Sequence, residues 1–110
     1  MHFRNTRIHA AGIRLVVTVQ TVVQGLPRGN AAMADQIRRA STSVVLNFAE
    51  GSSRATKKER RRFFDIARGS VFEVAAALDV CHALHVIDEE AWAEAIQQCD
   101  RLSAMLYSYH

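Results

Sequence analysis

A chain of 110 residues is long enough for one compact core but too short for two. Because 49% of the residues are hydrophobic and 23% are charged, the composition excludes an intrinsically disordered protein. The net charge of +3 conceals a strong polarity, since residues 28–68 carry a net +6 and residues 69–110 a net −6. Such an uneven distribution indicates charged partners.

The most apolar stretch, residues 8–26, contains Arg14 and two glutamines, which argues against both a membrane span and a signal peptide. The two cysteines, Cys81 and Cys99, lack the spacing of a disulfide framework. Because free cysteines are usual in reducing compartments, the expected location is the cytoplasm.

Helical periodicity is the dominant pattern along the chain, and no segment alternates cleanly enough for a strand. A first helix is expected over about 9–25, with apolar residues on more than one face, and Gly25 and Pro27 end it. A second helix is expected over about 30–50, beginning at Asn30 as a cap and ending at Gly51 as a C-terminal glycine.

A third helix is expected over about 56–86, starting at a capping box formed by Thr56 and Glu59. A fourth is expected over about 88–109, capped by Asp88. Four helices with short connections predict a single all-α domain, residues 1–110, folded as an antiparallel up-down four-helix bundle. Excess apolar surface on the first helix, together with the polarity of charge, favours assembly into a ring-shaped homo-oligomer.

A basic stretch opens the third helix: six of the nine residues from Arg54 to Arg62 are cationic, and two phenylalanines follow. On a helical wheel most of these cations point away from the expected core. Phe64 and Phe72 are expected on the same outward side, where they suit either stacking on nucleic-acid bases or a subunit interface. A plain solvated face is the third interpretation. We expect phosphate contacts from the following residues: Arg38, Arg39, Arg54, Lys57, Lys58, Arg61, Arg62 and Arg68.

Polar residues near the core side of the second and third helices are expected to form a structural hydrogen-bonded network. Its expected members are Asn47, Glu50, Ser70 and Glu73. Metal binding is a second use for side chains inside a bundle, and Asp79, His82 and His85 follow a D-x-x-H-x-x-H pattern. The wheel spreads these three over more than one face, so no metal or other cofactor is expected. No nucleophile–base pair with an orienting group is visible, and no enzymatic activity is expected.

Two segments, QIRRASTSVVLNFAEGSSR (36–54) and FFDIARGSVFEVAAALDV (63–80), carry the combination N-x-A-E-G and I-A-x-G-S. They resemble the signature of the four-helix-bundle proteins encoded in intervening sequences of bacterial 23S ribosomal RNA genes. That family is similar to the accessory protein of diversity-generating retroelements. The resemblance covers about residues 35–80 well, and it implies a barrel-shaped homopentamer that contacts nucleic acid or a nucleic-acid-processing protein.

The sequence therefore predicts a non-enzymatic, homo-oligomeric protein that contacts the phosphates of RNA or DNA through a basic face on the second and third helices. The alternative is an oligomeric scaffold that docks a protein partner and does not bind nucleic acid directly. The choice between RNA and DNA stays open.

Overall fold

The computed structural model describes residues 1–110 and contains helices but no strand. A short 3-10 turn, η1 (His2–Asn5), precedes α1 (Arg7–Gln24), α2 (Ala31–Ser52), α3 (Lys57–Ala83) and α4 (Glu89–Ser108). The predicted all-α class and the four helices are confirmed, with helix ends that differ from expectation by at most three residues, at the end of α3. None of the four combines the length and hydropathy needed to cross a bilayer.

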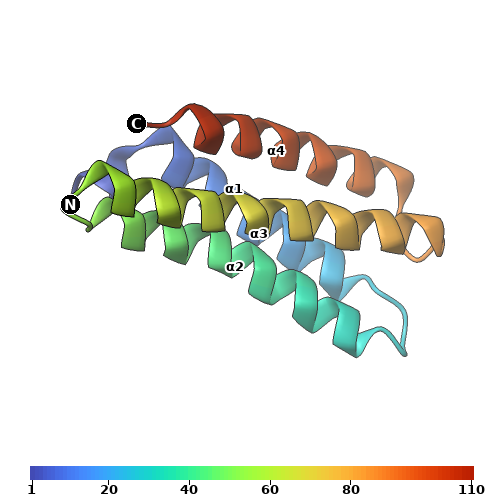
Figure 1. Cartoon of the computed structure of the whole chain (residues 1–110). Coiled ribbons are helices and arrows are strands. Elements are labelled where there is room, and N and C mark those ends of the chain that lie inside the picture. Colours follow the sequence, from blue (N-terminus) through green and yellow to red (C-terminus); the bar gives the residue numbers. More distant parts are fainter.

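The helices alternate in direction along an elongated body of 45 × 22 × 20 Å (Figure 1). Each helix packs against two neighbours, in the cyclic order α1, α2, α3, α4. The α1–α2 and α3–α4 connections therefore lie at one end of the body, whereas the α2–α3 turn and both chain termini lie at the other (Figure 1). This arrangement brings the beginning of α3 next to the end of α4.

Threonine side chains cap the N-termini of two of the helices. The Thr6 hydroxyl accepts a hydrogen bond from the His9 amide at 3.1 Å, and the Thr56 hydroxyl accepts one from the Glu59 amide at 3.1 Å. Each bond satisfies an amide that has no partner within the first turn of the helix. The predicted role of Thr56 is thereby confirmed, and its position fixes where the basic stretch enters α3.

The core is one cluster of 21 buried apolar residues contributed by all four helices. At the end that carries both termini, Phe48, Phe64 and Tyr109 pack ring against ring, with centroids 5.3–5.4 Å apart. The prediction that Phe64 points outward is wrong, because its side chain is only 2% exposed. The last turn of α2 and the residues after α4 cover this edge of α3. A helical wheel drawn for α3 alone does not include these two segments and therefore places Phe64 at the surface.

Gly51 lies inside the last turn of α2 and is buried, so its expected role as the residue that ends the helix is wrong. A Cβ atom at this position would lie 2.7 Å from Cε1 of Phe64 and 2.9 Å from Cβ of Phe63. Only a residue without a side chain allows α2 to approach α3 this closely. Close packing, rather than helix termination, explains the glycine.

Candidate nucleic-acid interface

The turn between α2 and α3 gathers exposed cations at one end of the bundle. Lys57 and Lys58 are exposed and form no salt bridge. The guanidinium groups of Arg54 and Arg62 lie 4.9 and 5.2 Å from the centroid of the Phe63 ring, at cation–π distance. Arg54 also pairs with Glu50 at 2.8 Å. We call this group the basic end: Arg54, Lys57, Lys58 and Arg62.

Two arginines of the same stretch are used inside the protein. Arg60 donates through Nη1 to the carbonyls of Arg54 and Ala55, both at 3.0 Å, and so holds the α2–α3 turn closed. Arg61 donates to the Leu106 carbonyl at 2.7 Å, to the Tyr109 carbonyl at 2.8 Å and to Asp65 at 3.0 Å. Carbonyls at a helix C-terminus lack internal donors, so Arg61 caps α4. Arg61 was expected to contact phosphates, but its donors point to these partners inside the protein.

A pocket of about 310 Å³ opens beside the basic end. Its walls are Lys57, Lys58, Arg60, Arg61, Phe64, Tyr109 and His110. The two arginines are fixed by their bonds to carbonyls, whereas the two lysines keep free ammonium groups. A hollow with cations at its rim and rings in its wall suits an anionic group attached to an apolar or aromatic body.

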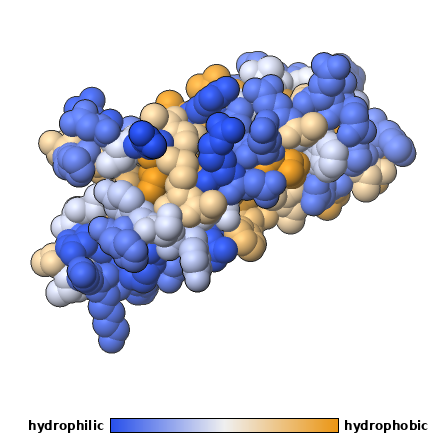
Figure 2. All heavy atoms as spheres, turned by 90° about the horizontal axis from the view of Figure 1, so that it is seen from above, coloured by the Kyte–Doolittle hydropathy of each residue, from blue (hydrophilic) through white to orange (hydrophobic).

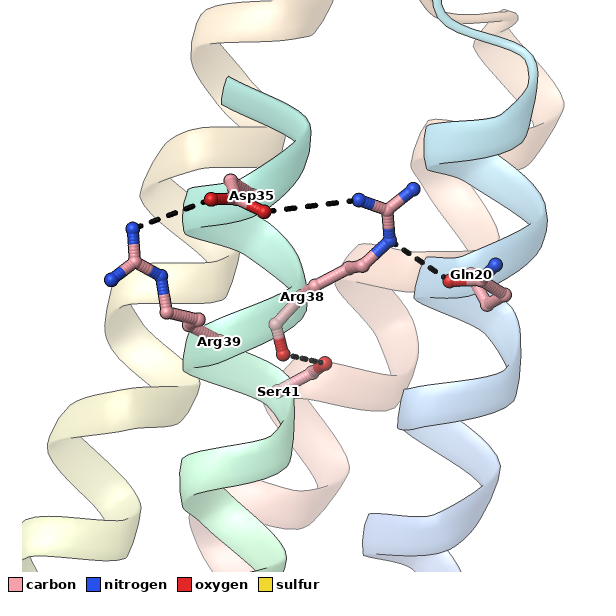
Figure 3. A network of polar contacts seen from close by, with 5 residues as sticks. All are labelled: Gln20, Asp35, Arg38, Arg39 and Ser41. Atoms are coloured by element: carbon pink, nitrogen blue, oxygen red, sulfur yellow. Dashed lines mark hydrogen bonds and ion pairs between the residues drawn. The ribbon is translucent and has the colours of Figure 1, made fainter. Parts of the chain in front are cut away.

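Arg38 and Arg39 form a second, separate group on α2 (Figure 3). The Asp35 carboxylate lies between them, 4.0 Å from Arg38 Nη1 and 3.5 Å from Arg39 Nη2. Arg38 also donates through Nε to Gln20 of α1 at 3.1 Å, which joins the two helices. Arg38 lies fourteen residues before Ser52, the last residue of α2, which corresponds to about 21 Å along the helix axis, and Arg54 lies beyond that end. The cations predicted on the second and third helices therefore do not form one continuous face.

Arg68 lies further along α3, between two exposed aromatic rings. Its guanidinium carbon is 4.9 Å from the ring centroids of both Phe72 and Tyr107, which are 55% and 68% exposed. The outward position predicted for Phe72 is confirmed. Tyr107, on α4, was not predicted, because its neighbour Arg68 is 39 residues away in the sequence.

The polar network is smaller than expected. Asn47 donates to the carbonyl and the hydroxyl of Ser43, both at 2.9 Å, and the Ser43 hydroxyl lies 2.8 Å from that of Ser70. This chain of bonds joins α2 to α3 and confirms two of the four predicted members. Glu50 is exposed and pairs with Arg54, so its predicted place in the network is wrong.

Glu73 also falls outside this network. It is exposed and accepts a hydrogen bond from Gln36 of α2. Asn47→Ala should therefore lower the free energy of unfolding by about 1 kcal/mol, because it removes both hydrogen bonds that Ser43 accepts from Asn47. Glu73→Ala should change it by less than about 0.5 kcal/mol, because water replaces the lost partner. Urea unfolding at one protein concentration measures both values, and equal losses would contradict this division.

Two residues of the D-x-x-H-x-x-H pattern, Asp79 and His82, connect α3 to α4. The His82 ring stacks on Trp92 at 3.8 Å, its Nε2 lies 3.0 Å from Glu89, and Trp92 donates to Asp79 at 3.0 Å. No group of three or more histidine, cysteine, aspartate or glutamate side chains is arranged to hold a metal ion. Packing of α4 on α3 is the role that these contacts support.

The two cysteines are free and buried in the core. Burial raises the pKa of Cys99 to about 12, with a smaller contribution from Asp100 and Asp79, and burial also raises the pKa of Cys81. Both thiols are therefore neutral at physiological pH, and neutral buried thiols are poor nucleophiles.

The comparison with protein families identifies the chain. A family model described as 23S rRNA-intervening sequence protein matches residues 4–108. The chain belongs to this family. The resemblance seen in α2 and α3 is thereby confirmed and extends to the two outer helices. No curated protein matches the sequence.

A solved structure shares the fold of this member of the 23S rRNA-intervening sequence protein family. It is the crystal structure of a protein with unknown function from the S23 ribosomal protein family of Bacteroides thetaiotaomicron. The TM-score is 0.85 and the sequence identity is 17%, over 92% of this chain and 95% of that chain. At this identity the likeness establishes the four-helix fold alone.

Proposed function

We propose that this chain is a non-enzymatic, homo-oligomeric protein that binds RNA or DNA by contacting backbone phosphates through the basic end. The observation that carries the proposal is the set of exposed cations without acidic partners, Lys57, Lys58 and Arg62, beside the pocket at the start of α3. Cations already paired with carboxylates gain little from a phosphate, whereas free cations release the counterions condensed on nucleic acid.

Self-assembly is part of the proposal, and a pentamer is the form that the family resemblance suggests. Ile13 and Val17 of α1 are exposed and lie one helical turn apart, and Leu46 of α2 is also exposed. Apolar residues also reach the surface among hydrophilic ones on the face drawn in Figure 2. Contacts between subunits would remove such residues from water. Light scattering should give a mass several times 12.3 kDa.

Salt-dependent binding tests the proposed interface. Affinity for short RNA and DNA should fall steeply with salt. A plot of the logarithm of the binding constant against the logarithm of the salt concentration should have a slope of about −3 to −4 for about four phosphate contacts. Replacing Lys57, Lys58 and Arg62 by alanine should flatten this slope by about two to three units, equally for all sequences. Replacing Arg14, Arg28 and Arg101 is the matched control, because these exposed residues lie outside the basic end and carry the same total charge.

Equal losses of affinity in the two triple variants would show that overall charge, rather than the basic end, attracts nucleic acid. Parental affinity in the first triple variant at every salt concentration would contradict the proposal. The alternative, a scaffold that docks a protein partner, would then be favoured, because arginines stacked on an aromatic ring such as Phe63 are also typical of protein interfaces. An acidic protein partner would occupy the same surface in that case.

A further inference from the structure

A row of cations and aromatic rings continues from the basic end along the outer surface of α3 and α4. We call it the α3–α4 strip: Lys57, Lys58, Arg68, Phe72 and Tyr107. We propose that this strip binds a single nucleic-acid strand, with phosphates on the lysines and Arg68 and with bases stacked on Phe72 and Tyr107. This inference rests on the proposed function and adds to it the kind of nucleic acid that is bound.

The strip is straight and long enough for several nucleotides. At 100° per residue, Lys57, Arg68 and Phe72 lie within about 60° of one another around the axis of α3. Fifteen residues separate Lys57 from Phe72, which corresponds to about 22 Å along α3, a span of several nucleotides. A short strand therefore reaches from the lysines to the rings without leaving one chain.

Arg68 carries a charge that the protein itself does not neutralise. It forms no salt bridge, and its Nε atom is buried without a hydrogen-bond partner. The flanking rings hold the guanidinium group in place through their faces. The side chain as a whole is partly exposed, so a phosphate beside the strip would pair with the charge of its guanidinium group.

Acidic residues set the limits of the strip. Asp65 is the acid on the same side of α3 between the lysines and Phe72, and its charge is paired with Arg61 at 3.0 Å. Beyond Phe72, Asp79 and Asp100 line a pocket of about 320 Å³ between α3 and α4. These carboxylates repel phosphates, so we expect the bound strand to end near Phe72.

The exposed rings favour a single strand over a duplex. Phe72 and Tyr107 offer ring surface to solvent, and base stacking on such rings requires bases that are not already stacked on their neighbours. In a duplex the bases are stacked on one another, and phosphate contacts alone would remain. A second copy of the chain could bind to the same rings instead of a nucleic-acid strand. The oligomeric mass of the Tyr107→Ala variant distinguishes these two cases.

Fluorescence anisotropy with a labelled 12-nucleotide oligo(dT) strand, its oligo(rU) counterpart and a 12-base-pair duplex tests the inference. The single strands should bind more tightly than the duplex. Tyr107→Ala should weaken single-strand binding about tenfold, as expected for loss of one base–aromatic stack, without changing the salt slope. Tyr107→Phe should retain the affinity because it keeps the ring. Leu84→Ala is the matched control, since Leu84 is similarly exposed but lies outside the strip.

Each other outcome counts against the strip. Duplex binding as tight as single-strand binding, or unchanged affinity in Tyr107→Ala, would overturn it while leaving the proposed function intact. A lower oligomeric mass in Tyr107→Ala would show that the rings are a subunit interface. Absence of binding to any of the three probes at low salt would overturn both the strip and the proposed function.

Discussion

Phe64→Ala should lower the free energy of unfolding by about 3–5 kcal/mol, the usual cost of removing a buried aromatic side chain. Phe64 is 2% exposed and contacts the rings of Phe48 and Tyr109, so its removal leaves a cavity at the junction of three segments. The cavity lies under the basic end, and relaxation around it would also disturb the pocket there. Loss of nucleic-acid binding in this variant would therefore report damage to the fold rather than a lost stacking contact.

Phe72→Ala is the matched control, since it removes the same side chain from the same helix. Phe72 is 55% exposed, and its removal should change stability by about 0.5 kcal/mol or less. Guanidinium unfolding of both variants should be measured at one protein concentration, because assembly makes the transition depend on concentration. A loss below about 1 kcal/mol for Phe64→Ala would contradict the buried position of this ring.

Gly51→Ala should lower the free energy of unfolding by about 1–3 kcal/mol, although alanine favours a helix over glycine. The added Cβ atom would lie 2.7 Å from the Phe64 ring and 2.9 Å from Cβ of Phe63. Neither neighbour is the free end of a flexible chain, so α2 and α3 must move apart. Thermal unfolding followed by circular dichroism measures the effect.

Gly69→Ala provides the control for Gly51→Ala, because a Cβ atom at Gly69 meets nothing within 4 Å. Gly69 lies within α3, and the substitution should stabilise the protein by about 0.5–1 kcal/mol. A double-mutant cycle adds a sharper test. Combining Gly51→Ala with Phe64→Leu should cost less than the two changes separately, because the smaller side chain gives the new methyl group room.

The sequence predicted the helices well because each depends on neighbouring residues. Periodicity placed all four, and the Thr56 cap is a contact between residues three positions apart. The family was also recognisable from two contiguous motifs. The misplacement of Phe64 has a different origin: its wheel position lies at the edge of the core, and only packing by α2 and Tyr109 decides that it is buried.

The candidate interface was harder to predict, because residues of one type have different roles there. Arg60, Arg61 and Arg62 are consecutive, but the first holds a turn, the second caps α4 and the third is exposed. The two carbonyl partners of Arg61 lie 45 and 48 residues away in the chain. Only the tertiary structure shows which cations have internal partners, and charge counts along the sequence overestimate the number available to phosphates.

The separation of charge along the 45 Å body has a consequence for the speed of association. The macrodipoles of antiparallel helices largely cancel, so the side chains determine the field. The basic end lies at the α2–α3 turn, whereas Asp88, Glu89 and Glu90 lie at the α3–α4 connection, at the opposite end (Figure 1). The chain thus has an electric dipole moment along its long axis. The field of a polyanion orients this dipole before contact, so that the basic end approaches first. Added salt should therefore lower the association rate constant by a larger factor than it raises the dissociation rate constant.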